Sequence, residues 1–323
     1  MTASDNPAGQ PEFVPKVADH QLLRRIGAGS GGQVWLARTT LGTYRAVKII
    51  YRRSFALHKP FEDELHGLVK FEPLSRQHDG LVDVLQVGGD PTGDFFYCVM
   101  ELADDVATGP HINPDRYQPR TLACDLSTRR RRPVGECIRV GVPIASALGF
   151  LHRQGLIHRD VKPANIIFIN GFPKLVDAGL VTEMFKPSSH VGTEGYIPPE
   201  GQGTVRSDIY ALGKVLYEIS TGKDRFDYPE LPADLRPTIE DQDLIRFNKI
   251  ILRACRTNPR LRFRDAEELT SALLAFEFGK HAPSREQKIK TLDHWLRIAG
   301  ITVALSVISY MVWHIVWLLR HSG

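Results

Sequence analysis

Residues 156–165 have the sequence LIHRDVKPAN, and Asp177-Ala178-Gly179 follows twelve residues after Asn165. Immediately before this stretch, residues 134–153 have apolar side chains at helical spacing. Pro143 lies inside that pattern, so we expect it to kink the helix or to end its first part. The decisive stretch is therefore predicted to follow a long, largely apolar helix.

The pattern changes character at Glu101. Before it, short alternating or β-branched runs are typical of strands: LLRRIG, QVWLART, YRAVKII, LVDVLQVG and FFYCVMEL. One helix is predicted in this part, over residues 60–71. After Glu101 the predicted elements are helices, including 207–222 and 243–256.

A glycine-rich stretch, Ile26-Gly27-Ala28-Gly29-Ser30-Gly31-Gly32-Gln33-Val34, lies between the first two predicted strands, and Lys48 is on the third. Glycines there would let backbone amides close over phosphates without a Cβ in the way. A dinucleotide-binding turn would lead into a helix, whereas QVWLART is typical of a strand. A Walker-type loop would continue with G-K-[ST], which is absent. A plain hairpin turn remains the alternative.

Together these stretches resemble the eukaryotic-type Ser/Thr protein kinase family in its bacterial style. The resemblance covers about 22–277 and rests on seven motifs in family order: GAGSGGQV, AVK, HRDVKPAN, DAG, GTEGYIPPE, SDIYALG and Arg262 within NPRLRF. It implies an α+β, bilobal kinase fold. The kinase domain is predicted over 21–277, with a small β-rich N-lobe (21–101) that has one main helix and a larger helical C-lobe (102–277).

The resemblance implies transfer of the ATP γ-phosphate, with Mg²⁺, to Ser/Thr hydroxyls of protein substrates. Asp160 would be the catalytic base, and Asn165 and Asp177 would be the Mg²⁺ ligands, because their oxygens suit a hard cation. Lys48 would hold the α- and β-phosphates and pair with a glutamate on the helix that follows. Lys162 would steady the transferring phosphate, and its placement favours Ser/Thr over Tyr acceptors.

Two glutamates compete for the role of partner to Lys48. Glu62 and Glu64 are two residues apart and so lie on different faces of the predicted helix. Glu64 fits the family's F-x-x-E spacing from Phe61 and is the predicted partner. Glu62 is then expected on a solvated face.

The ATP-binding residues implied by the resemblance are Ile26, Gly27, Ala28, Gly29, Ser30, Gly31, Gly32, Gln33, Val34, Ala46, Lys48, Met100 and Glu101. Met100 matches the residue that gates the pocket, although a plain core position is equally consistent with the sequence. Glu101 would offer its backbone carbonyl to the adenine amino group, so no particular side chain is needed there.

Several family positions are expected to serve the architecture. Thr193 matches the threonine that contacts the base and shapes the acceptor groove. Glu200 and Arg262 resemble a buried ion pair that braces the C-lobe, and Asp208 resembles the residue that holds the catalytic loop's backbone.

The sequence departs from the family pattern most clearly at Ala178, which replaces the phenylalanine of D-F-G. A Phe→Ala cavity costs about 3–5 kcal/mol when nothing fills it. The alternative function is therefore an ATP-binding pseudokinase scaffold with weak or no activity. A small-molecule phosphotransferase is disfavoured by GTEGYIPPE, which resembles a protein-substrate platform.

Regulation is predicted in the segment between Asp177 and Glu200. Ser188, Ser189 and Thr193 are candidate autophosphorylation sites. A phosphate on this segment would find a partner in Arg159, the arginine of HRD.

Composition limits the classes of partner. The chain has 323 residues, with 41 Lys+Arg against 37 Asp+Glu, a balance that does not indicate a nucleic-acid-binding protein. The one dense basic run, 129–132, is expected to be a solvated loop, with a docking patch for acidic partners or lipid as the alternative. Four cysteines without C-x-x-C spacing indicate reduced, buried thiols.

Residues 298–319 contain no Asp, Glu, Lys or Arg and would be about 33 Å long as a helix. We expect a single-pass transmembrane anchor in the cell membrane, able to self-associate, with the kinase facing the cytoplasm. A buried core helix is the alternative. Residues 1–20 are expected to be flexible, 278–297 to form a basic juxtamembrane linker, and 320–323 a short tail.

Overall fold

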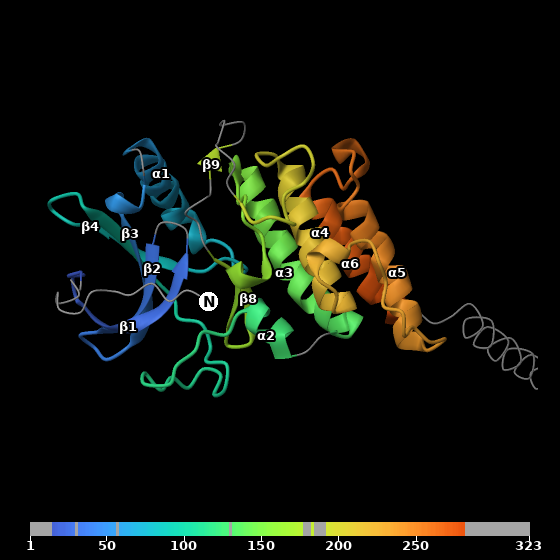
Figure 1. The fold of residues 1–323 in the computed structure, drawn as a ribbon, viewed down its shortest axis with the longest axis horizontal. Coiled ribbons are helices and arrows are strands. Elements are labelled where there is room, and N and C mark those ends of the chain that lie inside the picture. The colour runs from blue at the N-terminus through green and yellow to red at the C-terminus, as the bar shows by residue number, and fades with distance from the viewer. Residues whose placement is uncertain are drawn as a thin grey trace, which may run out of the picture. The chain divides into compact units, whose positions relative to one another are not determined.

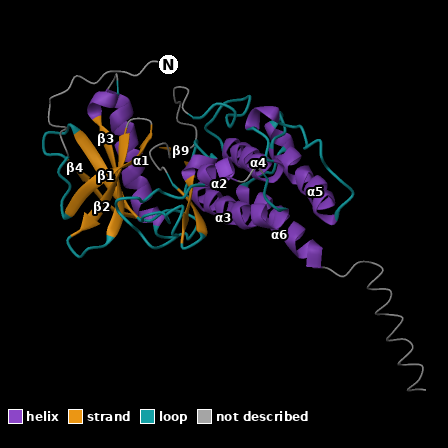
Figure 2. Ribbon diagram, turned by 60° about the horizontal axis from the view of Figure 1, so that its bottom comes forward, coloured by secondary structure: helices purple, strands orange, loops and turns teal. Residues whose placement is uncertain are grey.

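The computed structural model describes residues 15–29, 32–55, 58–128, 131–176, 182–183 and 192–281. The chain forms two compact units, residues 1–275 and 276–323. The main elements are β1 (His20–Gly29), β2 (Gly32–Thr39), β3 (Tyr44–Tyr51), α1 (His58–Ser75), β4 (Val84–Gly89), β5 (Phe95–Met100), α2 (Leu122–Thr128), α3 (Val134–Arg153), β6 (Leu156–Ile157), β7 (Ile166–Ile169), β8 (Phe172–Leu175), β9 (Thr182–Glu183), α4 (Val205–Thr221), α5 (Ile239–Ala254) and α6 (Ala266–His281). The predicted order, a strand-rich part followed by a helical part, is confirmed (Figures 1 and 2).

The first five strands form one antiparallel sheet in the order β1-β2-β3-β5-β4. Strand side chains point alternately to opposite faces, which gives the sheet two different surfaces. One surface is an apolar core that includes Trp35, Val47, Ile49, Tyr97 and Val99. The other surface carries Lys48, which is paired with Val34 on β2 and with Cys98 on β5.

The connection from α1 to β4 ties the sheet to the helical part. The amide of Val84 donates to the hydroxyl of Ser75, the last residue of α1, over 3.0 Å. Farther along, the amide of Leu175 on β8 donates to the carbonyl of Gly80 over 2.8 Å. A Cβ on Gly80 would stand 2.7 Å from the carbonyl oxygen of Pro143 on α3, so only glycine allows this close approach.

Helix α3 runs through Pro143 without a break, so Pro143 does not end its first part. Within the described residues it is the one helix long and apolar enough to cross a membrane, and most of it is buried inside the protein. It packs against α4 and β8, which makes it a core helix. The predicted span, 298–319, lies outside the described residues.

Two arginines of the basic run, one buried and one half-buried, form ion pairs with neighbouring helices, which corrects the predicted solvated loop at these two positions. Arg132 is 8% exposed and its Nη2 lies 2.5 Å from Oδ2 of Asp125 on α2, with Glu136 of α3 on its other side. Arg131 forms an ion pair with Asp241 on α5. These pairs join three helices, which a charge run alone does not reveal. Arg129 and Arg130 lie outside the described residues.

The four cysteines are free thiols, as predicted. Cys98, Cys137 and Cys255 are buried, whereas Cys124 is half-buried. Burial raises the pKa of the Cys255 thiol to about 12, so this side chain stays protonated in the core at neutral pH.

Candidate active site

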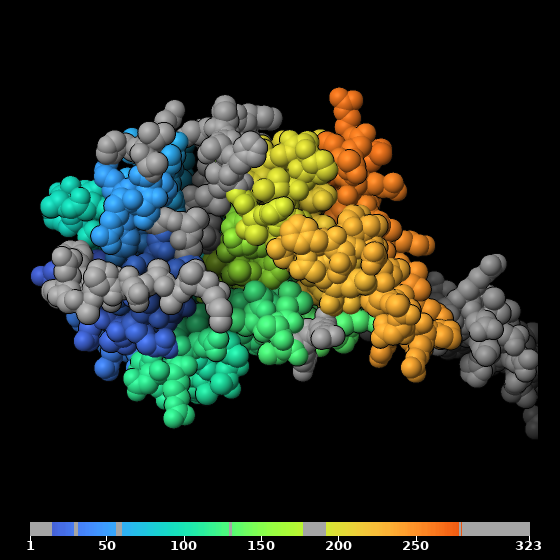
Figure 3. All heavy atoms as spheres, in the orientation of Figure 1, coloured from blue at the N-terminus to red at the C-terminus, as the bar shows by residue number. Residues whose placement is uncertain are grey.

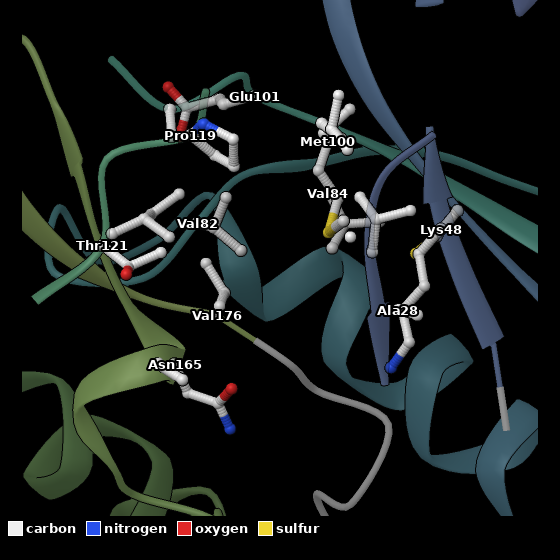
Figure 4. A pocket seen from close by; sticks show the side chains of 18 of the residues that line it. Ala28, Lys48, Val82, Val84, Met100, Glu101, Pro119, Thr121, Asn165 and Val176 are labelled. Carbon is white, nitrogen blue, oxygen red and sulfur yellow. The ribbon is translucent and has the colours of Figure 1, made fainter. Parts of the chain in front are cut away.

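A cavity of 340 Å³ lies between the sheet and α1 on one side and the segments 103–121 and 162–176 on the other (Figure 4). Lys48 and Asn165 lie toward one end of it, and Met100, Glu101 and Pro119 toward the other (Figure 4). The predicted site residues that line it are Ile26, Gly27, Ala28, Val34, Ala46, Lys48, Glu64, Met100, Glu101, Lys162 and Asn165.

Gly29 is the last residue of β1. Two further described members of the glycine-rich stretch, Gly32 and Gln33, do not line the cavity. The carboxamide oxygen of Gln33 accepts a hydrogen bond from the Trp35 indole over 3.2 Å instead. A Cβ on Gly32 would stand 2.6 Å from the carbonyl oxygen of Ile49, so glycine there allows the strands to pair. Ser30 and Gly31 lie outside the described residues.

Among the described residues, sequence reasoning missed more than half of those that line the cavity. On the strands, strict alternation with Lys48 and Met100 would have found Ile50, Phe96 and Cys98. No comparable signal marks Tyr117, Pro119 and Thr121, which come from the connection between β5 and α2. The remaining lining residues are Leu68, Phe71, Val82, Val84, Ala103, Ala164, Ile167 and Val176.

Lys48 and Glu64 form an ion pair inside the cavity wall, with Nζ and Oε1 3.7 Å apart. Each residue is 8% exposed. Glu62, the competing glutamate, is exposed on α1. The choice of Glu64 from the F-x-x-E spacing thus matches the geometry, because only one face of α1 turns toward β3.

Asp160 is 5% exposed and lies at the centre of a hydrogen-bonded cluster. Nζ of Lys162 is 2.6 Å from Oδ2 of Asp160. The Asn165 amide donates to the same oxygen over 2.9 Å and to the Asp160 carbonyl over 2.8 Å. The Thr193 hydroxyl donates to Oδ1 over 2.9 Å. Both carboxylate oxygens are therefore held in place, as an orienting base requires.

Asp208 on α4 holds the backbone of the loop that carries Asp160. Its two carboxylate oxygens accept the amides of His158 and Arg159, each over 2.9 Å, and Oδ2 lies 2.9 Å from Nε2 of His152. Burial by itself would raise the pKa of Asp208, but these hydrogen bonds and the nearby histidines hold it below its usual value. Arg159 has φ 68°, a left-handed conformation that costs a non-glycine residue about 1–3 kcal/mol and is often found at functional sites.

A single family model accounts for this arrangement. The model of the protein kinase domain matches residues 20–280. The chain belongs to the protein kinase family. The hydrogen-bonded cluster around Asp160 and the Lys48–Glu64 pair thus lie at the kinase motif positions that the sequence predicted.

Several bacterial relatives are similar to this kinase. The probable serine/threonine-protein kinase PknB of Corynebacterium glutamicum is 28% identical over 80% of this chain and 42% of its own length. The serine/threonine-protein kinase PknB of Mycobacterium leprae is 30% identical over 86% of this chain and 46% of its own. PknG of Mycolicibacterium smegmatis, a serine/threonine-protein kinase, is 35% identical over 51% of this chain and 22% of its own. The chain thus spans less than half the length of these three relatives.

The Glu101 side chain has a partner, which the sequence did not indicate. Its carboxylate accepts from Nζ of Lys174 on β8 over 2.6 Å and from the Asp83 amide over 3.0 Å. The end of β5 is thereby tied to the helical part of the kinase, and the expected role of the Glu101 backbone carbonyl stays a prediction.

The predicted ion pair between Glu200 and Arg262 is present. The two guanidinium nitrogens of Arg262 donate to the two oxygens of Glu200 over 2.6 and 2.8 Å. Other predictions cannot be placed: Asp177, Ala178, Ser188 and Ser189 lie outside the described residues.

Proposed function

We propose that this kinase transfers the γ-phosphate of ATP to serine and threonine hydroxyls of proteins, as a Mg²⁺-dependent enzyme. The observation that carries the proposal is the Asp160 carboxylate, held on both oxygens beside a cavity that contains the Lys48–Glu64 pair. Phosphoryl transfer asks a protein mainly for positioning and for neutralisation of phosphate charge. This site supplies groups for both.

The cavity suits a nucleotide because its two ends differ. Ile26, Val34, Ala46 and Met100 give the inner walls an apolar character that fits a flat purine base. Lys48 supplies a positive charge toward the other end, and Glu64 holds the ammonium group in place. We assign the base to the apolar end and the phosphates to the end near Lys48.

The acceptor hydroxyl is assigned to Asp160. As the phosphorus–oxygen bond forms to the acceptor, the hydroxyl proton passes to the Asp160 carboxylate, and the bond to the ADP oxygen breaks. Nζ of Lys162 lies 2.6 Å from that carboxylate and supplies positive charge next to the phosphoryl group as it is transferred. Thr193 bridges both residues, since its hydroxyl accepts from Lys162 over 2.8 Å.

Asn165 fits a role as a Mg²⁺ ligand. Its amide nitrogen is engaged by Asp160, which leaves the carbonyl oxygen as the atom for a cation, and carbonyl and carboxylate oxygens are what Mg²⁺ prefers. The Val176 amide donates to the Asn165 backbone carbonyl over 2.9 Å, so the chain passes Asn165 directly before Asp177, the second proposed ligand. Bound there, Mg²⁺ would neutralise phosphate charge.

The test of function uses the full-length protein, Mg-ATP labelled in the γ-phosphate, and a generic protein acceptor. Wild type should label serine and threonine in the acceptor, and Asp160→Asn should lower kcat by about 10²–10⁴-fold while Mg-ATP still binds. Labelling on tyrosine alone, or a fully active Asp160→Asn variant, would contradict the proposal.

A pseudokinase scaffold is the second candidate, and it rests on Ala178 in place of the D-F-G phenylalanine. It predicts Mg-ATP binding by calorimetry with no transfer by wild type. Restoring the ring with Ala178→Phe separates the two candidates further, because a scaffold weakened by that loss should gain transfer. An active wild-type protein would exclude the scaffold.

We also propose that residues 298–319 anchor the kinase in the cell membrane, with the kinase domain (21–277) in the cytoplasm, where ATP is available. The support is the uncharged stretch of 22 residues and a preceding segment, 277–297, with five Lys/Arg against three acids. Wild type should stay in membranes after an alkaline carbonate wash, and Leu305→Arg should be released. Release of wild type would contradict the anchor.

A further inference from the structure

The connection between β5 and α2, residues 101–121, is fixed by two buried carboxylates, one that ties it to the helical part of the kinase and one that closes it on itself. Asp104 accepts the amides of Asn170 and Gly171, in the turn between β7 and β8, over 2.8 Å each. Asp105 accepts the Gln118 amide over 2.8 Å, which closes the connection on itself. Both aspartates are at most 6% exposed. The connection thus moves with the C-lobe.

Tyr117 makes this connection a wall of the nucleotide cavity. The residue is 2% exposed and lines the cavity together with Pro119 and Thr121. Its hydroxyl donates to the carbonyl of Ala103, three residues after Met100, over 3.1 Å. Burial and the nearby Asp105 raise the pKa of Tyr117 far above its usual value, so the hydroxyl remains a donor at any physiological pH.

Arg24 reaches the same connection from the other lobe. It lies on β1, three residues before Gly27, and its Nε donates to the Pro114 carbonyl over 2.8 Å. One of its terminal nitrogens donates to the carbonyl of Tyr117. Figure 3 shows the connection, in green, directly against the blue N-terminal strands. One arginine therefore bridges the sheet and a segment fixed to the C-lobe.

The hydrogen bonds between β1 and β2 do not by themselves fix the position of β1 around Arg24. The contacts of Arg24 with the β5–α2 connection therefore matter for where β1 lies. The ladder between β1 and β2 is irregular on both sides of Arg24, between Leu22 and Arg24 and between Arg25 and Gly27. A bulge interrupts ladder hydrogen bonds and lets a strand bend. Hydrogen bonds from a charged donor are among the stronger ones in proteins. The Arg24 hydrogen bonds can therefore hold β1 in position where its pairing with β2 is irregular.

We propose that Arg24 and Tyr117 are positioning residues that hold Gly27 and Ala28 of β1 in place over the nucleotide. This inference rests on the proposed function, because it assigns ATP to the cavity. Without Arg24, Gly27 and Ala28 keep their pairing with β2 but lose the tie to the C-lobe that holds them near the nucleotide, while the Asp160 cluster in the C-lobe is untouched. The bridge therefore acts on nucleotide affinity and not on the chemical step.

The test compares full-length variants by steady-state kinetics. Arg24→Ala should raise the KM for ATP about tenfold with kcat within about twofold, and Arg24→Lys should restore part of the affinity. Tyr117→Phe, which loses only the hydroxyl, should raise KM about threefold. The double variant should fall short of the product of the two effects, because both act through the placement of Tyr117. Arg38→Ala, exposed on β2, is the matched control.

A purely structural role gives a different result. If Arg24→Ala lowers Tm but leaves the KM for ATP within twofold of wild type, the proposal is wrong. Failure of the proposed kinase activity can be distinguished from failure of this proposal. If the kinase activity is absent, wild type binds Mg-ATP but transfers no phosphate. In that case the same variants are compared by calorimetric Kd for Mg-ATP, and equal Kd values for wild type and Arg24→Ala would overturn the bridge.

Discussion

The hydroxyl of Thr193 donates to Oδ1 of Asp160 over 2.9 Å, although 33 residues separate them in the sequence. The Thr193 hydroxyl oxygen in turn accepts a hydrogen bond from Nζ of Lys162 over 2.8 Å. Thr193 therefore completes the cluster from outside the catalytic loop. Its hydroxyl is engaged on both sides, which favours a role in holding Asp160, and phosphorylation at Thr193 stays a prediction.

Thr193→Val removes this hydroxyl at nearly constant volume and is expected to lower kcat about 10- to 100-fold. The reason is that a hydrogen bond to a charged group contributes about 1.5–3 kcal/mol, and about 1.4 kcal/mol is a factor of ten in rate. The KM for ATP should change little because the nucleotide walls are intact. Thr193→Ser keeps the hydroxyl and should retain most activity; if it is as impaired as Thr193→Val, the methyl group and not the hydroxyl is what the site needs.

Glu64→Gln is expected to raise the KM for ATP and to lower kcat, each by about tenfold. The substitution leaves the buried ammonium of Lys48 with a neutral partner, so its placement toward the phosphates weakens. Glu62→Gln on the exposed face of the same helix is the matched control and should behave as wild type. Steady-state kinetics with ATP varied checks both, and equal effects of the two variants would show that the ion pair is not the cause.

The predicted site residues that the structure brings together lie at short fixed spacing in the sequence. Asp160, Lys162 and Asn165 lie within six residues of one another, so a single local motif determines their meeting. The choice of Glu64 as partner of Lys48 followed from its sequence spacing from Phe61 on the same helix, since helical periodicity decides which face a residue is on.

The residues it missed depend on contacts between distant segments. Tyr117 belongs to a connection without periodicity, and only the fold shows that it reaches Ala103 and Arg24. Arg132 looks like any surface arginine until α2 and α3 place Asp125 and Glu136 beside it. In each case the partner is fixed by packing, which one-dimensional patterns do not contain.

Arg262→Ala is expected to lower the free energy of unfolding by about 3 kcal/mol, which corresponds to a fall in Tm of roughly 10 °C. The Arg262 side chain is fully buried, and it also donates to backbone carbonyls of Arg256 and Arg206. We take the lower end of the usual range because the Glu200 side chain is 28% exposed, so water relieves part of the loss. Thermal unfolding of Arg260→Ala, at an exposed neighbour, should match wild type within about 0.5 kcal/mol. A wild-type Tm for Arg262→Ala would contradict a bracing role for the pair.

The lowered pKa of Asp208 predicts how the free energy of unfolding depends on pH. Its pKa in the folded protein lies below the ordinary 3.8, because the amides and histidines around the carboxylate outweigh the opposing effect of burial. The unfolded chain therefore takes up a proton first as the pH falls. The stabilisation by Asp208 is complete above about pH 5 and is lost as the pH falls through 3.8 toward the lower folded-state pKa.

Asp208→Asn isolates this contribution from that of the other carboxylates. The variant should be less stable than wild type at pH 7, because Asn offers one acceptor oxygen where His158 and Arg159 need two. The difference between the two proteins should shrink between pH 5 and pH 3, since only wild type loses the carboxylate's contribution there. Urea unfolding at several pH values measures this difference, and a gap that stays constant down to pH 3 would show that the Asp208 pKa is the same in the folded and unfolded chains.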